Sequence, residues 1–377
     1  MDIFNGKTDL FGYYQVGNQK FYNKFDAVKS HEKTGIHPEW IFNDAVFSCY
    51  DWTKEPNESL AELYRRRAEQ LREKYDYIIL FFSGGADSTN VLQSFINNNI
   101  HLDEIATYCY FEGEKNHRDK ELIDVAIPYA RKVLDAHPEI VHRVFDQSKD
   151  LYNLFSNGDL TEQYFYTQAG QIGPGNSRSH IYFYKTFYKD LLDAGKKICF
   201  LFGSDKPRVF QDKDTNKWYF RFIDCIDNVI KLNHNVPAEL FYWSPDLPEL
   251  LIKQAHIIKR YLENSTEISP FVSTENSQLA CKNFGNKTLW LNTHGVHSLI
   301  YPNWDINTFT YGKNFGGPVW SKRFSWFYNL GETDTALKNW NQTLQKRWTM
   351  IPDYWKNDIN NIRKSIKGCW SRNYYLN

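Results

Sequence analysis

The stretch YIILFFSGGADST (77–89) joins an apolar run to two glycines, an acid and several hydroxyl side chains. The six apolar or aromatic residues at its start predict a buried strand, and the residues after Gly85 predict the beginning of a helix. A turn of this kind binds phosphate, because the N-terminus of a helix offers unpaired N–H groups and a partial positive charge. Gly84 and Gly85 carry no Cβ atom that would keep the backbone away from an anion.

The polar side chains of this turn suit the same chemistry. Ser83 and Ser88 add hydroxyl donors, and Asp87 is suited to hold a divalent cation beside phosphate oxygens. Three other motifs do not fit, since a Walker loop needs GxxxxGK[ST], a dinucleotide fold needs GxGxxG and a nucleophile elbow needs GxSxG. The sequence therefore predicts a pyrophosphate cradle with a metal-holding acid.

The elements around this turn alternate between strand and helix patterns. Nearly continuous apolar runs predict strands, and apolar residues at helical spacing predict the helices between them. The predicted strands are 77–82, 104–111, 140–145 and 197–203, and the predicted helices are 86–98, 117–136 with a bend at Pro128, and 179–195. Such alternation predicts an α/β fold, a doubly wound parallel sheet with helices on both faces.

Composition narrows the class of protein. Lysine plus arginine and aspartate plus glutamate both total 45, and this zero net charge argues against a basic nucleic-acid coat. None of the six cysteines forms a CxxC pair, which predicts free thiols in a reducing cytoplasm rather than a zinc or redox motif. The longest apolar runs have the length of strands, so we expect no membrane-spanning segment.

The segment SGGADS (83–88), standing between a strand and a helix, resembles the SGGxDS motif of the PP-loop ATP pyrophosphatase superfamily. This superfamily includes asparagine synthetase, the 7-cyano-7-deazaguanine synthases and tRNA-thiolating enzymes, and the resemblance covers about 75–210. It implies a sheet of order 3-2-1-4-5 that binds ATP and Mg²⁺ at its switch point. It also implies attack on the α-phosphate of ATP, release of pyrophosphate, and displacement of AMP by a nucleophile such as ammonia or an amine.

The resemblance places a second turn, FGSDKPR (202–208), beside the first one. Gly203 and Ser204 would contact phosphate, and Asp205 would share the metal with Asp87. Lys206 and Arg208 are suited to neutralise charge on departing pyrophosphate. Together with Asp87, these two cations are the predicted catalytic residues.

The sequence evidence for the remaining candidate residues is weaker. The resemblance places adenine near Thr107 and Tyr108, and Arg178 is a candidate for reaching phosphate from the glycine-rich loop 170–175. The cations of the helix predicted over 247–265 form a stripe that either faces solvent or receives an anionic substrate, and the histidines of THGVHS are a poor metal signal. These residues are Lys253, His256 and Arg260, and His294 and His297.

The predicted organisation has three parts. Residues 1–74 form a lead-in with a hairpin turning at Gly17-Asn18, and with a helix over 59–74 that Ser59 and Glu62 cap. Residues 75–235 form the ATP-binding domain, in which 207–224 predicts an antiparallel hairpin. Residues 236–377 form an aromatic-rich, mainly helical lobe that selects the substrate, and its first helix has Pro248 in the first turn.

The best-supported expectation is an adenylate-forming ligase or synthase that activates a carboxylate or amide-type oxygen of a small molecule. Position 2 is Asp2, and the lead-in is too short for a glutaminase domain, so the nucleophile would be free ammonia, an amine substrate or ammonia from a separate partner. One alternative is an enzyme of the same fold that modifies a nucleobase, tRNA or DNA. Another is a non-catalytic nucleotide-binding regulatory protein.

Overall fold

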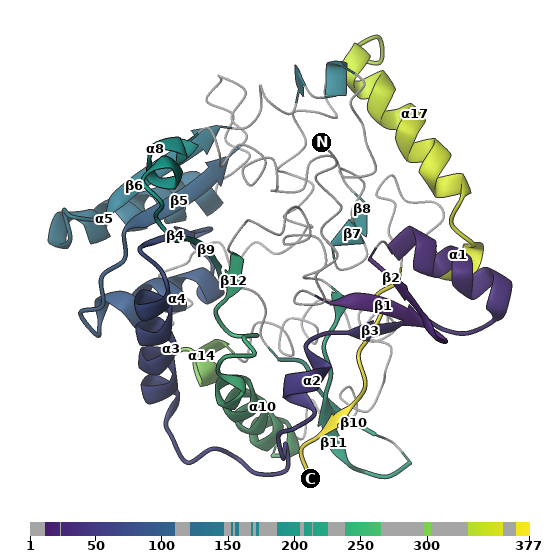
Figure 1. The fold of residues 1–377 in the computed structure, drawn as a ribbon, viewed down its shortest axis with the longest axis horizontal. Coiled ribbons are helices and arrows are strands. Elements are labelled where there is room, and N and C mark those ends of the chain that lie inside the picture. Colours follow the sequence, from purple (N-terminus) through teal and green to yellow (C-terminus); the bar gives the residue numbers. More distant parts are fainter. Residues whose placement is uncertain are drawn as a thin grey trace.

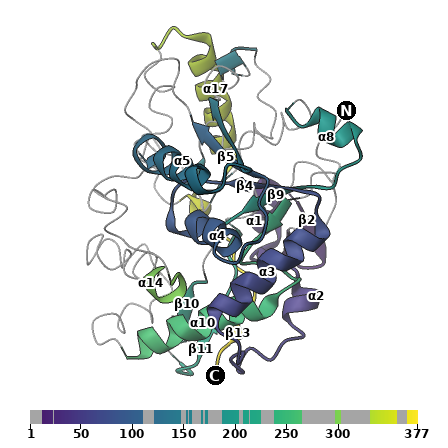
Figure 2. The same ribbon diagram turned by 90° about the vertical axis from the view of Figure 1, so that its left-hand side faces the viewer.

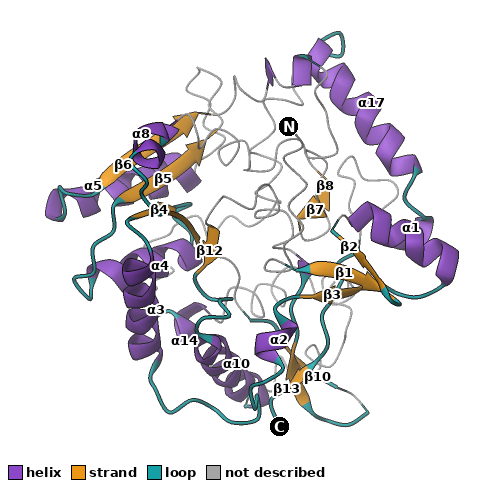
Figure 3. Ribbon diagram, viewed as in Figure 1, coloured by secondary structure: helices purple, strands orange, loops and turns teal. Residues whose placement is uncertain are grey.

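A parallel sheet lies at one side of the chain in the computed structural model (Figures 1 and 3). The structure describes residues 12–22, 24–109, 121–146, 152–153, 155–157, 167–168, 171–172, 187–203, 207–212, 214–224, 238–264, 297–302, 331–356 and 367–377. The five strands of the sheet are β4 (Tyr77–Phe81), β5 (Glu104–Cys109), β6 (Val141–Asp146), β9 (Ile198–Phe202) and β12 (Ala238–Leu240). The predicted α/β class with a parallel sheet is confirmed.

The strands are ordered β12-β9-β4-β5-β6 across the sheet. The chain enters at the central strand β4, adds β5 and β6 on one side, and later adds β9 and β12 on the other. Ile78, Ile79 and Leu80 of β4 are fully buried, as expected for a central strand covered on both faces. The direction of strand addition reverses between β4 and β9, so the carboxyl ends of these two strands form the switch point of the sheet.

Helices cover both faces of the sheet (Figure 2). The helices on the first face are α3 (Leu60–Lys74), α4 (Ala86–Ile96) and α5 (Ile127–Ala136), and α8 (Lys189–Asp193) lies on the other. Tyr129 of α5 contacts Phe82, with ring centroids 5.9 Å apart. Tyr188, next to α8, packs against Tyr77 at 6.4 Å and Phe200 at 5.8 Å on the opposite face.

The predicted helix 117–136 differs from the observed one. Residues Glu121–Ala126 form a π-helix, η2, and α5 follows with Pro128 in its first turn. Pro128 has no N–H to bond an earlier carbonyl, which accounts for a widened turn before it rather than a continuous α-helix. Of the predicted helix 179–195, the described part contains α8, and 179–186 lies outside the described residues.

The N-terminal elements follow local sequence signals. They are β1 (Tyr13–Val16), β2 (Gln19–Phe21), α1 (Lys24–Thr34), β3 (Glu39–Ile41) and α2 (Asp44–Phe47). β1 and β2 pair in antiparallel fashion across Gly17-Asn18, so the predicted hairpin is confirmed. The helix predicted over 59–74 is confirmed as α3, and Ser59 and Glu62 form the predicted capping box.

Elements from the second half of the chain pack beside the N-terminal elements. They are β10 (Val209–Gln211), β11 (Trp218–Phe220), α10 (Pro248–Glu263), α14 (His297–Ile300), α17 (Thr335–Thr349), the 3₁₀-helix η7 (Asp353–Trp355) and β13 (Tyr374–Tyr375). A short antiparallel pair, β7 (Thr167–Gln168) and β8 (Gln171–Ile172), lies between β6 and α8 in the chain. β10 and β11 form the predicted hairpin, and β13 joins it from the C-terminal end. Residues 265–296 and 303–330 lie outside the described residues, so the mainly helical lobe stays a prediction.

A buried ion pair joins the N-terminal elements to the segment that follows β11. Lys24 of α1 lies 2.5 Å from Asp224, and both side chains are almost completely buried. Tyr14 of β1 donates a hydrogen bond of 3.1 Å to the same carboxylate. The backbone N–H of Trp40 also donates to the carbonyl of Trp370 at 2.9 Å. These contacts attach the antiparallel strands at the N-terminus to those at the C-terminus.

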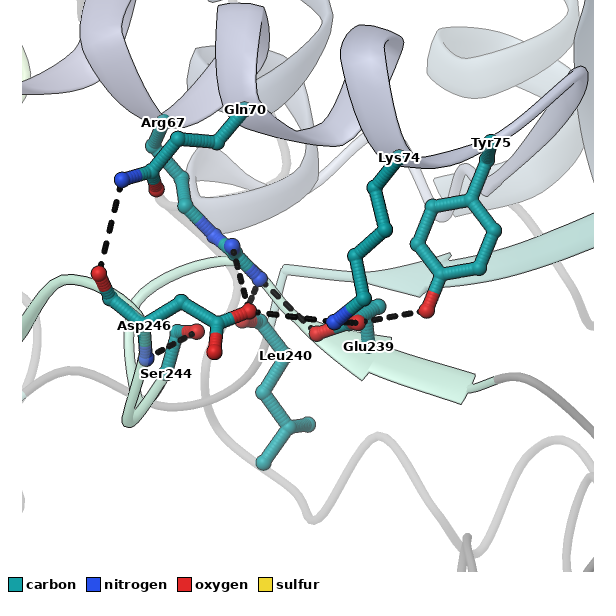
Figure 4. Close-up of polar contacts among 8 residues, drawn as sticks. All are labelled: Arg67, Gln70, Lys74, Tyr75, Glu239, Leu240, Ser244 and Asp246. Atoms are coloured by element: carbon teal, nitrogen blue, oxygen red, sulfur yellow. Dashed lines mark hydrogen bonds and ion pairs between the residues drawn. The ribbon is translucent and has the colours of Figure 1, made fainter. Parts of the chain in front are cut away.

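Helix α3 is joined to strand β12 by a second network of charges (Figure 4). A charged run such as Arg65–Arg67 usually faces solvent rather than clamping phosphate, but the side chain of Arg67 is fully buried. Its Nη2 lies 2.9 Å from Oε2 of Glu239 and donates to the carbonyl of Leu240 at 3.3 Å. The same carboxylate accepts from Lys74 at 2.7 Å and from the Tyr75 hydroxyl at 2.6 Å. The acid that retains Arg67 inside the protein is 172 residues away, so no local pattern indicates it.

Glu104, the first residue of β5, is a buried carboxylate held by three donors. It accepts hydrogen bonds from the hydroxyls of Tyr188 at 2.6 Å and Tyr77 at 2.9 Å, and from Nε of Arg143 at 3.1 Å. Burial raises the pKa of the Glu104 carboxyl above its ordinary value, against the opposing effect of these donors. The network lies at the amino end of the strand, away from the switch point, and joins Tyr188 to the sheet.

Glu104→Gln is expected to flatten the pH dependence of the free energy of unfolding. Because the pKa of Glu104 is raised in the folded state, its contribution to stability is complete below its unfolded value of about 4.5 and is lost as the pH rises through the folded value. Urea unfolding between about pH 4 and pH 8 should show this decline in the wild type and not in the variant. Parallel curves for the two proteins would contradict the assignment.

Among the described residues, no helix is both long enough and apolar enough to cross a membrane.

Candidate nucleotide site

The glycine-rich turn begins where β4 ends and leads into α4. Gly84 is buried and has a φ of +75°, a conformation that side chains rarely adopt. A Cβ atom at this position would lie 2.9 Å from the backbone N and Cα of Ala126 in the π-helix η2. Gly85 is the N-cap of α4 and supplies no side-chain capping bond. The turn thus lies between β4 and the N-terminus of α4, in the strand–turn–helix order that the sequence predicts, and the absence of a side chain at Gly84 lets η2 pack against it.

Gly84→Ala is expected to lower the free energy of unfolding by about 1–3 kcal/mol more than Gly195→Ala does. Gly195 has a similar φ of +71°, but a Cβ atom there would meet nothing within 4 Å. The pair therefore separates backbone strain, which both variants share, from the clash with Ala126. Urea denaturation gives the comparison, and equal losses would show that η2 does not pack closely on the turn.

Two serine hydroxyls hold the shape of the turn. Oγ of Ser83 accepts from the backbone N–H of Gly85 at 3.3 Å and lies 3.3 Å from Oγ of Ser88. The Ser88 hydroxyl donates to the carbonyl of Gly85 at 3.2 Å and accepts from the backbone N–H of Ser83 at 3.3 Å. Both predicted binding serines thus lie in the turn and bond its backbone.

The turn that follows β9 contacts the first turn of α4. A Cβ atom on Gly203 would lie 3.0 Å from the backbone carbon and oxygen of Asp87 and 3.1 Å from Cα of Ser88. The structure therefore brings Gly203 together with Asp87 and Ser88. Arg208 is partly buried and precedes β10. The other predicted residues of this part of the site, Arg178, Ser204, Asp205 and Lys206, lie outside the described residues.

A cluster of buried tyrosines surrounds Asp87, and sequence reasoning missed it. The Tyr301 hydroxyl donates to Oδ1 of Asp87 at 2.5 Å, and the Tyr242 hydroxyl donates to the main-chain carbonyl of Asp87 at 2.8 Å. Asn90 in α4 donates to the Tyr242 hydroxyl at 3.0 Å. Burial raises the pKa of Tyr242 and of Tyr301, so both phenols remain protonated donors at neutral pH. In the sequence, Tyr242 and Tyr301 follow no pattern that links them to residue 87.

The predicted adenine site at the end of β5 is described in part. The Thr107 side chain is completely buried, donates to the carbonyl of Phe82 at 3.3 Å and lies 3.2 Å from Nε2 of His142. Burial lowers the pKa of His142, which favours the neutral ring. A base at this position would therefore meet the backbone of β5 rather than the Thr107 hydroxyl. Tyr108 belongs to β5, and its side chain lies outside the described part.

The residues described at this turn fit a magnesium ion that is also bound by phosphate. Mg²⁺ prefers oxygen ligands and is commonly held by one or two carboxylates plus substrate phosphates, and the half-buried Asp87 offers one such carboxylate. Within the described ranges no three His, Cys, Asp or Glu side chains gather into a metal site. Asp205 and His294 and the side chain of His297 lie outside those ranges.

The cation stripe of α10 is covered by the segment that precedes α3. Nζ of Lys253 lies 2.8 Å from Glu55 and donates to the carbonyl of Pro56 at 2.9 Å, while Arg260 also pairs with Glu55. Nε2 of the buried His256 donates to the carbonyl of Trp52 at 2.9 Å. The stripe as a whole is therefore neither a solvated face nor an open anion site. Glu55 supplies the counter-charge for Lys253 and Arg260.

The chain matches no model of a known protein family, and no curated protein resembles it closely enough in sequence to count as a match. Its functional interpretation therefore depends on the motif and on the geometry described above.

Proposed function

We propose that the protein is an ATP-dependent, adenylate-forming ligase or synthase of the PP-loop class. The observation that carries this proposal is the contact of Gly203 with Asp87, which joins the turns after β4 and β9 at the switch point. The strand order β6-β5-β4-β9-β12 supports it, because numbering the strands along the chain gives the order 3-2-1-4-5 that the resemblance implies. We place the reaction in the cytoplasm, since Cys49, Cys199 and Cys369 are free thiols.

The proposal assigns roles to the main functional groups of the two turns. The N–H groups at the start of α4, together with Gly84 and Gly85, bind the β- and γ-phosphates of ATP. Asp87 holds Mg²⁺, which when bound neutralises charge on the phosphate oxygens. Lys206 and Arg208 stabilise the charge that develops on pyrophosphate, and Ser204 and Asp205 complete the second turn.

The reaction requires positioning and charge stabilisation rather than a protein nucleophile. A carboxylate or amide-type oxygen of a small molecule forms a bond to the α-phosphorus as the bond from that phosphorus to the bridging oxygen of pyrophosphate breaks. The bridging oxygen leaves with its electron pair as part of pyrophosphate. Ammonia or an amine, either free or delivered by a separate partner protein, then attacks the activated carbon and expels AMP, losing one proton to solvent.

Calorimetric titration of the protein with ATP tests this site directly. We expect one molecule of ATP to bind per chain in the presence of Mg²⁺, and both pyrophosphate and AMP to compete with it. Competition by pyrophosphate is the informative part, because pyrophosphate shares with ATP only the groups that the turn at 83–88 would bind. ATP binding that pyrophosphate does not displace would place the nucleotide elsewhere on the protein.

A second candidate is an enzyme of the same fold that acts on a nucleobase, tRNA or DNA. It is favoured by Tyr354, a residue that is 56% exposed and whose ring lies 3.7 Å from Nζ of Lys367 and 5.7 Å from the ring of His31. An exposed ring beside a cation suits base stacking in single strands. Binding of a single-stranded oligonucleotide that weakens with salt and with Tyr354→Ala would support this candidate, and no binding at low salt would eliminate it.

A further inference from the structure

Tyr301 reaches the carboxylate of Asp87 from a distant part of the chain. The two residues are 214 positions apart, and the hydroxyl donates to Oδ1 at 2.5 Å. The Tyr301 side chain is 1% exposed, so the hydroxyl sits in a fixed environment. Its ring lies 5.5 Å from the ring of Tyr242, whose hydroxyl bonds the main-chain carbonyl of the same aspartate. The tyrosines thus fix both the main chain and the side chain of Asp87.

The direction of the hydrogen bond follows from the chemistry of its two groups. The phenol of Tyr301 carries an O–H that can donate. An ionised carboxylate has only acceptor atoms, so Tyr301 donates and Asp87 accepts. Hydrogen bonds to a charged acceptor are about twice as strong as those between neutral groups, which makes this contact suited to select one orientation of the carboxylate.

The segment that carries Tyr301 is itself anchored to two helices of the fold. The Tyr64 hydroxyl of α3 donates to the main-chain carbonyl of Ile300. Gln254 of α10 donates to the Tyr64 hydroxyl at 3.0 Å. Ile300 is fully buried beside Tyr301. The main chain beside Tyr301 is therefore held by α3 and α10, outside the turn that its hydroxyl contacts.

From this geometry we infer that Tyr301 is a positioning residue for Asp87, which orients the carboxylate toward the Mg²⁺ that accompanies ATP. The inference depends on the proposed function, since it assigns to Tyr301 a task within that same site. Mg²⁺ requires nearly ideal octahedral geometry, so its affinity is sensitive to the freedom of a ligating carboxylate. Residues that hold a metal ligand in place commonly change metal affinity by about 10- to 100-fold when replaced.

The test compares Tyr301→Phe with Tyr188→Phe. Each substitution removes one buried hydroxyl that donates to a carboxylate, but Tyr188 bonds Glu104 at 2.6 Å, at the opposite end of the sheet. ATP binding is measured calorimetrically at increasing Mg²⁺ concentration. We expect Tyr301→Phe to raise the Mg²⁺ concentration for half-maximal binding by about tenfold, and Tyr188→Phe to leave it unchanged.

Two further measurements make the outcome decisive. ATP affinity without Mg²⁺ should be equal in all three proteins, because the phenylalanine ring preserves the packing, and thermal melts report any loss of folding. An unchanged Mg²⁺ requirement in Tyr301→Phe, an equal change in Tyr188→Phe, or a loss of Mg²⁺-free binding would overturn the inference while the proposed function stands. If the wild type binds no ATP with Mg²⁺, the proposed function fails before Tyr301 is tested.

Discussion

Replacing Asp87 by alanine is expected to lower the rate of ATP turnover by about 10²- to 10³-fold, the size of effect seen when one group that stabilises transition-state charge is removed. The Asp87 side chain lies in the first turn of α4 and is half-buried. Its loss would remove the oxygen ligand that places Mg²⁺ against the phosphates. Initial rates of pyrophosphate release, measured at saturating ATP, give the comparison.

Asp87→Asn is the matched control for this experiment. The asparagine side chain keeps the size of aspartate and retains an oxygen that accepts from Tyr301, but it has no negative charge. We expect it to lose nearly as much activity as the alanine variant, because the charge rather than the volume holds the cation. Wild-type turnover in either variant would remove Asp87 from the site, whereas a lowered melting temperature would indicate a structural effect.

Arg67→Met is expected to lower the free energy of unfolding by about 3 kcal/mol. Removing one partner of a buried ion pair commonly costs about 3–5 kcal/mol, since the remaining charge is left uncompensated in the interior. The lower end applies here because Lys74 and Tyr75 still contact Glu239. Against a total stability of about 5–15 kcal/mol, this is a large fraction, and urea denaturation will measure it.

Arg65→Met provides the comparison for Arg67 within the same helix. Arg65 is half exposed and pairs with Glu69 one turn away, so its replacement should change stability by less than about 1 kcal/mol. Both variants make the same chemical change two positions apart on α3. Equal losses would show that the network at β12 does not stabilise the fold through Arg67.

Local sequence signals predicted much of the architecture. The hairpin at Gly17-Asn18, the capping box of Ser59 and Glu62, and the apolar strand before Gly84 each depend on residues within a few positions of one another. Alternation of strand and helix patterns was enough to predict the parallel sheet, because crossovers between parallel strands require helices. The position of the glycine-rich turn at the end of β4 followed from the same pattern.

The features that escaped prediction depend on residues far apart in the sequence. Tyr301 contacts Asp87 across 214 residues, and Arg67 contacts Glu239 across 172. Neither tyrosines in an aromatic-rich chain nor arginines in a charged run carry a local signal of their partners. Glu55 likewise neutralises the α10 stripe from a segment without helical or strand periodicity. Such contacts become visible only when the fold brings the segments together.

Analysis of the nucleotide products is the most direct test of adenylation. The protein is incubated with ATP, Mg²⁺ and a small-molecule cell extract, and separately with cellular RNA and DNA, with Asp87→Ala alongside. We predict AMP and pyrophosphate in equal amounts, formed only by the wild type and only when the extract is present. Formation of ADP and phosphate would contradict an attack on the α-phosphorus, and ATP binding without any product in all mixtures would instead fit a nucleotide-binding regulatory protein.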